Sequence, residues 1–159
     1  MTSEAVAGSA ARNGGTRRII VMMGAPGAGK GTQAERLAEA LSLPHVSTGE
    51  LFRAMLKSDT PLARKVQEYM ESGALVPDDI VLAMVDDRLT WKDAGDGVIL
   101  DGFPRTVAQA EALDRMLAKL GTAVTAVPYI EVPTELLLAR LTGRRICTKD
   151  DQHLYHVVA

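Results

Sequence analysis

The stretch MMGAPGAGKGTQAERL, residues 22–37, decides the fold. Four glycines fall within eight residues, from Gly24 to Gly31, and Lys30 stands among them. The preceding run RIIVMMG, residues 18–24, is short, apolar and rich in β-branched side chains, which predicts a strand buried on both faces. An apolar repeat at helical spacing follows the glycines. The stretch therefore predicts a strand, a glycine-rich loop and a helix in direct succession.

This order is the setting that the phosphate-binding motif G-x-x-x-x-G-K-[ST] requires. Gly24, Gly29 and Lys30 have the motif's spacing, although Gly31 occupies the hydroxyl position and Thr32 follows one residue later. Glycines let several backbone N–H groups point at one anion, and the helix start adds further N–H groups and its dipole. We call residues 24–31 the glycine loop and expect it to bind a polyphosphate.

The remaining chain alternates predicted strands with predicted helices. Further strands are expected at residues 44–48, 96–102 and 125–132, and helices at 31–43, 49–59, 60–73, 77–91, 106–121 and 133–143. Pro128 is awkward in a central strand and indicates an irregular or edge position. Residues 144–159 have strand-like ends around a polar turn, as in a hairpin. This alternation predicts a parallel α/β sheet with right-handed crossovers.

The composition is that of one soluble globular domain: 159 residues, 47% apolar and 24% charged. A net charge of −2 with both signs mixed favours neither nucleic acid nor a membrane surface as partner. Cys147 is the lone cysteine, so an intrachain disulfide is impossible and a reducing, cytoplasmic setting is expected. Residues 1–17 are rich in Gly, Ser and Ala, which predicts a disordered leader ahead of a single domain at 18–159.

Five blocks of the sequence resemble the adenylate kinase family, in its bacterial long-lid form. In chain order they are GAPGAGKGTQ, HVSTGELFR, ESGALVPDDI, LDGFPRTVAQAEAL and LTGRRICTKDDQHLYHV. The resemblance implies a P-loop NTPase-type parallel sheet flanked by helices, with a helical AMP-binding insert at about residues 47–76. It also implies a mobile lid that begins near residue 143. Family members continue well beyond this chain's last residue, so we expect a partial lid at 143–159 and weakened catalysis.

The resemblance implies reversible phosphoryl transfer from Mg-ATP to AMP, giving two ADP. Such chemistry relies on in-line positioning and charge neutralisation, and the acceptor phosphate is already anionic, so no general base is needed. Two alternatives stay open: a UMP/CMP-type kinase, and a fragment that binds nucleotides but catalyses poorly. Small nucleotides are the expected partners, and a monomer is the expected state.

On the ATP side, the resemblance assigns the residues that surround the transferring phosphates and those of the lid. Arginines at the lid hinge bring charge to the transferring group as the lid excludes water. The expected ATP ligands are Gly27, Ala28, Gly29, Lys30, Gly31, Thr32, Arg140, Arg144, Leu154 and Tyr155. The expected catalytic residues are Lys30, Arg105, Arg140 and Arg144.

On the AMP side, the resemblance assigns Arg53 and Arg105 to the phosphate, which guanidinium groups bind with paired donors, and Thr48 and Gln109 to adenine. UMP/CMP kinases usually carry alanine where Thr48 stands, so Thr48 favours AMP. Structural explanations also exist, since Thr48 could simply cap a helix and the arginines could be surface residues. The expected AMP ligands are Thr48, Arg53, Ala74, Leu75, Val76, Gly102, Phe103, Pro104, Arg105 and Gln109.

Metal sites are expected at one place only. Asp101 ends a predicted strand, where α/β sheets put their ligands, and the resemblance assigns it to Mg²⁺ through water. A simple Asp-Gly turn is the alternative. Cys147 and Asp150 supply half of a lid zinc site, and structural zinc needs four ligands, so zinc is not expected. His153 and His156 would lie on opposite faces of a strand.

Overall fold

The computed structural model describes residues 17–72, 76–146 and 154–156. The strands are β1 (Arg18–Gly24), β2 (His45–Ser47), β3 (Gly97–Asp101), β4 (Val124–Ala126), β5 (Tyr129–Ile130), β6 (Arg144–Ile146) and β7 (Leu154–His156). The helices are α1 (Lys30–Leu41), α2 (Thr48–Leu56), α3 (Pro61–Glu71), α4 (Asp78–Leu89), the 3₁₀ turn η1 (Lys92–Ala94), α5 (Val107–Lys119) and α6 (Thr134–Gly143). The elements follow the predicted order, with α2, α3 and α4 in succession between β2 and β3.

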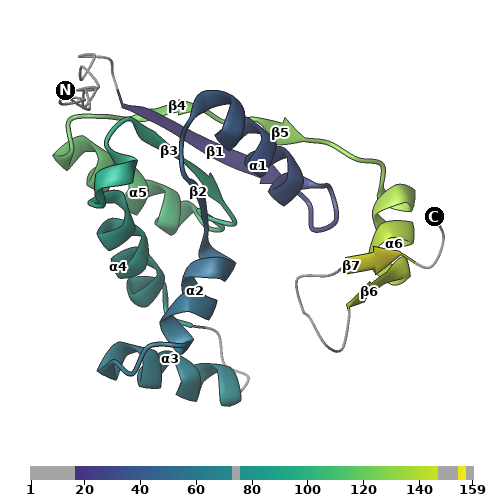
Figure 1. Ribbon diagram of the computed structural model, residues 1–159, viewed down its shortest axis with the longest axis horizontal. Coiled ribbons are helices and arrows are strands. Elements are labelled where there is room, and N and C mark those ends of the chain that lie inside the picture. The colour runs from purple at the N-terminus through teal and green to yellow at the C-terminus, as the bar shows by residue number, and fades with distance from the viewer. Residues whose placement is uncertain (1–16, 73–75, 147–153, 157–159) are drawn as a thin grey trace, which may run out of the picture.

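The central sheet is parallel, in the order β2-β3-β1-β4, with β5 pairing the end of β1 (Figure 1). The register aligns Met22 with Asp101, and Ser47 with the same Asp101 on the other side. Three strands therefore end side by side. In an open parallel sheet this carboxyl edge is where ligands bind, and the glycine loop, α2 and the Asp101–Arg105 turn all leave from it.

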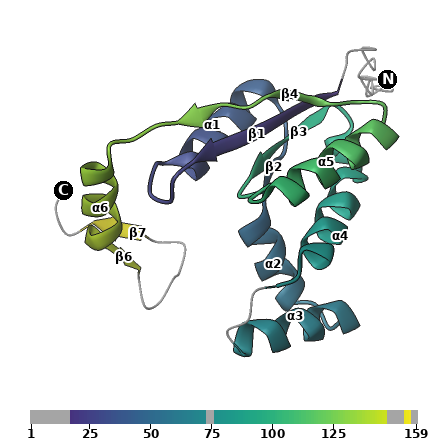
Figure 2. The same cartoon turned by 180° about the vertical axis from the view of Figure 1, so that it is seen from behind.

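The side chains of β1 alternate between the two faces of the sheet, and a hydrophobic cluster lies on each face. Ile19 and Val21 pack with α4 and α5 in a cluster that also holds Phe103 and Leu117. On the opposite face Ile20 and its neighbours pack against α1. Helices cover both faces of the sheet (Figures 1 and 2), and the two central strands, β1 and β3, are accordingly apolar along most of their length.

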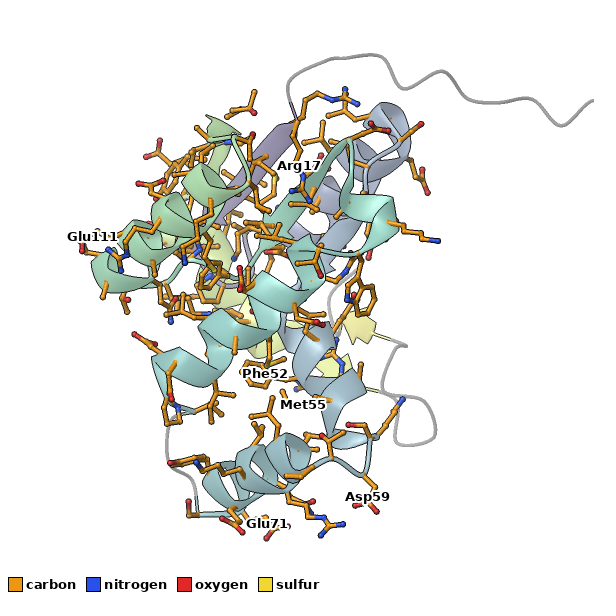
Figure 3. All side chains as sticks on the ribbon, turned by 90° about the vertical axis from the view of Figure 1, so that its left-hand side faces the viewer. Arg17, Phe52, Met55, Asp59, Glu71 and Glu111 are labelled. Carbon is orange, nitrogen blue, oxygen red and sulfur yellow. The ribbon has the colours of Figure 1, made fainter. Side chains whose placement is uncertain are left out.

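Two extensions leave this core at different places. α2 and α3 form one, below the sheet in Figure 1, and α6 with the β6–β7 hairpin forms the other. Figure 3 shows Phe52 between α2 and α4, and Met55 between α2 and α3. Thr60 caps α3, since its Oγ1 accepts a hydrogen bond from the Ala63 N–H at 3.1 Å. The cap satisfies one of the N–H groups that the start of α3 leaves without a partner inside the helix.

The predicted fold class is confirmed: a parallel sheet flanked by helices, with an irregular strand around Pro128 and a C-terminal hairpin. Arg17 is the first residue that the structure describes. Arg17, which the sequence placed at the end of the leader, donates from Nε to the Ala94 carbonyl at 2.8 Å and from Nη2 to the Leu89 carbonyl. These bonds hold Arg17 to the core, while residues 1–16 lie outside the described part of the chain.

Candidate functional site

The glycine loop curls between β1 and the first turn of α1. Gly29 is the N-cap residue of α1 and has φ 95°, a left-handed conformation that costs glycine little. The first N–H groups of a helix have no partner within it, and the positive end of the helix dipole coincides with them. The loop and the start of α1 therefore form a backbone surface suited to an anion.

Two cations lie on the loop and bond to its carbonyl groups. Lys30 donates from Nζ to the Ala25 carbonyl at 3.2 Å. Arg140, from α6, donates from Nη1 to the carbonyls of Gly27 at 3.3 Å and Ala28 at 3.5 Å. The loop points toward α6 in both ribbon views (Figures 1 and 2). The fold thus brings a residue from the far end of the chain to the predicted phosphate site.

Asp101 lies at the end of β3, with its carboxylate 3.4 Å from Nε2 of His45 on the neighbouring strand. The interaction with this carboxylate raises the pKa of His45 above its usual 6.5, although burial acts in the opposite direction. Asp101 also faces α1, because a Cβ placed on Gly31 would stand 3.7 Å from Oδ2. One carboxylate beside a phosphate-binding loop is a common way to hold Mg²⁺, whose other ligands are water and phosphate oxygens.

The first cavity, of about 540 Å³, opens where these elements meet. It joins residues of the glycine loop and Asp101 to residues of β2, α2 and the turn after β3. Its lining includes Gly24, Lys30, Thr48, Asp101, Gly102, Phe103, Pro104 and Arg105. A single cavity therefore contacts residues that the sequence assigned to both the ATP side and the AMP side.

The second cavity, of about 370 Å³, adjoins the first and shares Thr48, Gly102 and Arg105 with it. Its remaining lining comes from α2, α4 and α5, and comprises Phe52, Val76, Asp78, Val81, Thr106 and Gln109. Thr48 is the first residue of α2 rather than its N-cap, and its Oγ1 donates to the Gly102 carbonyl at 3.2 Å. The helix-capping explanation of Thr48 is therefore replaced by a contact within the site.

Other predicted site residues lie elsewhere or outside the described residues. Arg53 is exposed on α2 and lines neither cavity. Thr32 is exposed on α1. Arg144, Leu154 and Tyr155 belong by their backbones to the β6–β7 hairpin. Ala74, Leu75, Cys147, Asp150 and His153 lie outside the described residues.

Sequence reasoning missed two polar residues of the site, His45 and Asp78. Gln109, nearly buried, donates from Nε2 to Asp78 Oδ1 at 2.6 Å, across a separation of 31 residues. The sequence around Asp78 signals only the start of a helix. His45 looked like an ordinary strand residue, and its contact with Asp101 depends on the pairing of β2 with β3. Both contacts arise from tertiary structure.

Comparison with known proteins identifies the family of this chain. A sequence model of the family described as adenylate kinase matches residues 22–156. The chain belongs to the adenylate kinase family. Among curated relatives, it is 58% identical to an adenylate kinase of Gloeobacter violaceus over 132 residues, which cover 83% of this chain and 60% of that protein.

Similar identities are found with two other bacterial adenylate kinases. The chain is 55% identical to that of Desulforamulus reducens over 139 residues, covering 87% of this chain and 65% of the relative. It is 54% identical to that of Carboxydothermus hydrogenoformans over 138 residues, covering 87% of this chain and 64% of the relative. The chain therefore spans less than two thirds of the length of these family members.

The described residues contain no group of three or more His, Cys, Asp and Glu side chains placed to hold a metal ion. No helix among them is long and apolar enough to cross a membrane.

Proposed function

We propose that this protein transfers the terminal phosphoryl group of Mg-ATP to AMP, giving two ADP. The observation that carries the proposal is the first cavity, which Lys30, Asp101, Thr48 and Arg105 line together. Phosphoryl transfer needs donor and acceptor phosphates in contact and in line, with their charge neutralised. A cavity shared by a phosphate-binding loop and an acceptor site meets that need.

On the donor side, the glycine loop and α1 bind the ATP phosphates through backbone N–H groups, and Lys30 supplies a compact charge. Arg140 already lies against the loop carbonyls and is positioned to turn toward phosphate oxygens. Mg²⁺, when bound, supplies positive charge between the phosphates, and Asp101 is the residue that would hold it. We assign the same donor side to Gly27, Ala28, Gly29, Gly31, Thr32, Arg144, Leu154 and Tyr155.

On the acceptor side, Arg105 contacts both cavities and is assigned to the AMP phosphate, together with Arg53. Guanidinium groups bind phosphate with two parallel donors, which fixes the direction of attack. The second cavity is assigned to the adenine base, with Thr48 and Gln109 as polar contacts and Phe52, Val76 and Val81 as apolar walls. Apolar walls with a few placed polar groups are typical of small-molecule sites.

The proposal also covers the domain organisation, the oligomeric state and the cellular compartment. Residues 47–76, which include α2 and α3, would form the AMP-binding insert, and residues from 143 onward would form a lid. We propose that the protein works as a monomer on nucleotides in the cytoplasm. The lone Cys147 is compatible with such a reducing compartment.

The test is an assay of ADP formation by the purified chain with ATP, Mg²⁺ and one acceptor at a time: AMP, CMP or UMP. AMP is expected to give the highest rate. Thr48→Ala is expected to lower the ratio of the AMP rate to the CMP or UMP rate by about tenfold, which corresponds to the free energy of one buried hydrogen bond. Thr90→Ala, at an exposed position beyond the site, is the matched control. A faster rate with CMP or UMP would favour the rival kinase. Nucleotide binding without ADP formation would overturn the transfer proposal.

A further inference from the structure

The Gln109 amide is held on two sides in the second cavity. Its Oε1 accepts a hydrogen bond from the Arg105 backbone N–H at 2.7 Å. Its Nε2 donates to Asp78 Oδ1 at 2.6 Å. Gln109 as a residue is 5% exposed. It lies in the first turn of α5, where its backbone N–H also donates to the Thr106 hydroxyl at 3.1 Å. Backbone and side chain of this residue are therefore both fixed before any ligand binds.

These two neighbours permit one orientation of the amide. A backbone N–H can only donate, and an ionised carboxylate can only accept. Turning the amide by half a turn would set its NH₂ group against the Arg105 N–H and its oxygen against Asp78. Both hydrogen bonds would then become repulsive contacts to the nearly buried Gln109 amide, which is costly. The bond to the carboxylate is charge-assisted, so Asp78 contributes more to this preference than the neutral N–H does.

The fixed amide still has hydrogen-bonding capacity for a ligand. A glutamine amide has two N–H donors and two oxygen lone pairs, and the two contacts above use one of each. One donor and one acceptor remain beside the second cavity. A 6-aminopurine offers a ring-nitrogen acceptor next to an amino donor, which matches this pair. A 6-oxopurine offers a ring N–H donor next to an oxygen acceptor, which matches only the turned amide.

We propose that Asp78 is a positioning residue that fixes the Gln109 amide and thereby makes the acceptor site select 6-aminopurine over 6-oxopurine nucleotides. The inference rests on the proposed function, because it takes the second cavity to hold the acceptor's base. Asp78 need not touch the nucleotide. It acts through Gln109, so its loss should alter the choice between bases more than the affinity for nucleotides in general.

A helix-stabilising role is the competing explanation of Asp78. Acidic residues in the first turn of a helix interact favourably with its dipole, and Asp78 and Asp79 both occupy the first turn of α4. Both are exposed residues, but Gln109 bonds to Asp78. Asp79→Asn is therefore a matched control, since it removes the same charge from the same helix end and leaves the Gln109 contact in place.

The test is calorimetric titration of AMP and IMP, which differ at the two purine positions in question. It uses the full chain, Asp78→Asn and Asp79→Asn, with thermal unfolding as the check on folding. In Asp78→Asn the ratio of the two dissociation constants should move toward unity by about tenfold, within the discrimination expected of paired contacts to a base. The change should come from weaker AMP binding with IMP binding kept or improved. Asp79→Asn should retain the parent ratio.

Gln109→Met provides the second arm. It removes the amide, so the preference for AMP should fall, and adding Asp78→Asn in this background should change the ratio no further. If Asp78→Asn prevents folding, Asp78→Ser replaces it, because serine is also favoured at helix starts.

The possible results separate the two proposals. An unchanged AMP-to-IMP ratio in Asp78→Asn, a parallel loss for both nucleotides, or an equal change in Asp79→Asn would each overturn the role of Asp78 while leaving the acceptor site intact. If the parent chain binds neither nucleotide, the proposed function fails and this inference fails with it.

Discussion

The acceptor side and the donor side of the site differ in how far their polar groups are fixed before a ligand binds. Thr48 and Gln109 are 4% and 5% exposed, and hydrogen bonds to the surrounding protein orient their side chains. On the donor side, Gly29 and Arg140 are exposed, and the cations bond to the loop's own carbonyls. The acceptor side therefore carries fixed, desolvated polar groups, whereas the donor side must exchange its own contacts for those of a ligand.

The two sides should therefore contribute differently to base selectivity and to the stabilisation of phosphate charge. Fixed and nearly buried groups discriminate between ligands, since a wrong partner leaves them unpaired. Exposed cations around a backbone loop stabilise phosphate charge, with little dependence on what else the ligand carries. We therefore expect base selectivity to depend on the acceptor side and transition-state stabilisation on the donor side.

The largest expected effect is on the donor side, at Lys30. Lys30→Met should lower the rate of ADP formation by about 10²- to 10³-fold, the usual loss when one preorganised charge contact to the transition state is removed. Folding should be unaffected, because its described hydrogen bond is a weak one to the Ala25 carbonyl at 3.2 Å. The assay compares initial rates, with Lys65→Met, an exposed lysine of α3, as control. Equal rates in parent and Lys30→Met would contradict the donor-side assignment.

The next largest effect compares one glycine from each side. Gly102, on the acceptor side, has φ 78°, and an added Cβ would stand 2.9 Å from Thr48 Oγ1 and 3.3 Å from Arg105 Nη2. Gly29, on the donor side, has φ 95° with nothing within 4 Å of such a Cβ. Alanine at either site costs about 1–2 kcal/mol for the left-handed backbone.

Gly102→Ala should cost roughly 1–3 kcal/mol more than Gly29→Ala, because a packed site must also yield to the methyl group. Urea unfolding of both variants measures the difference in free energy of unfolding. Equal losses would mean that the acceptor side is as open as the donor side, and the comparison between them would fail.

The regularities that predicted the fold are local in the chain. The apolar run at 18–24, the glycines after it and the helical repeat beyond them specified β1, the glycine loop and α1 without any long-range contact. Pro128 likewise separates β4 from β5, as its missing N–H group predicts. Each of these features depends on neighbouring residues, so a single sequence suffices to find it.

The site's internal contacts could not be found in the same way. Arg140 meets the carbonyl of Gly27 across 113 residues of sequence, and Gln109 meets Asp78 across 31. Such pairs follow from how α6 and α4 pack, and the local pattern around each residue would be the same without them. The resemblance to a family supplied Arg140 and Gln109 as site residues, but it did not supply Asp78.

The smallest expected effect concerns α4, the helix that begins with Asp78. At its other end Arg88 makes two hydrogen bonds to Asp93, at 2.8 and 2.7 Å, and lies 4.6 Å from the Trp91 ring centre. The hydrogen bonds from Arg88 lower the pKa of Asp93 below its usual 3.8. A lowered carboxylate pKa stabilises the folded state above the unfolded value, and this contribution is lost as pH falls through the folded value.

The free-energy difference between the parent and Arg88→Met should therefore be constant near neutral pH and shrink below about pH 4. The part that changes should stay under about 1 kcal/mol, because Asp93 is half exposed and solvent screens the pair. Urea unfolding at several pH values measures it. A difference that does not vary with pH would show that the ion pair adds nothing, leaving only packing and the Trp91 contact.

The most direct test of independent donor and acceptor sides is a calorimetric titration of AMP into Lys30→Met beside the parent chain. If the acceptor side is complete in the folded protein, the AMP dissociation constant should stay within about twofold of the parent value, the range in which separate sites act additively. ATP binding to the same variant should be clearly weakened. A loss of AMP affinity in parallel with the loss for ATP would contradict the account, because the two sides would then form one site that depends on the glycine loop.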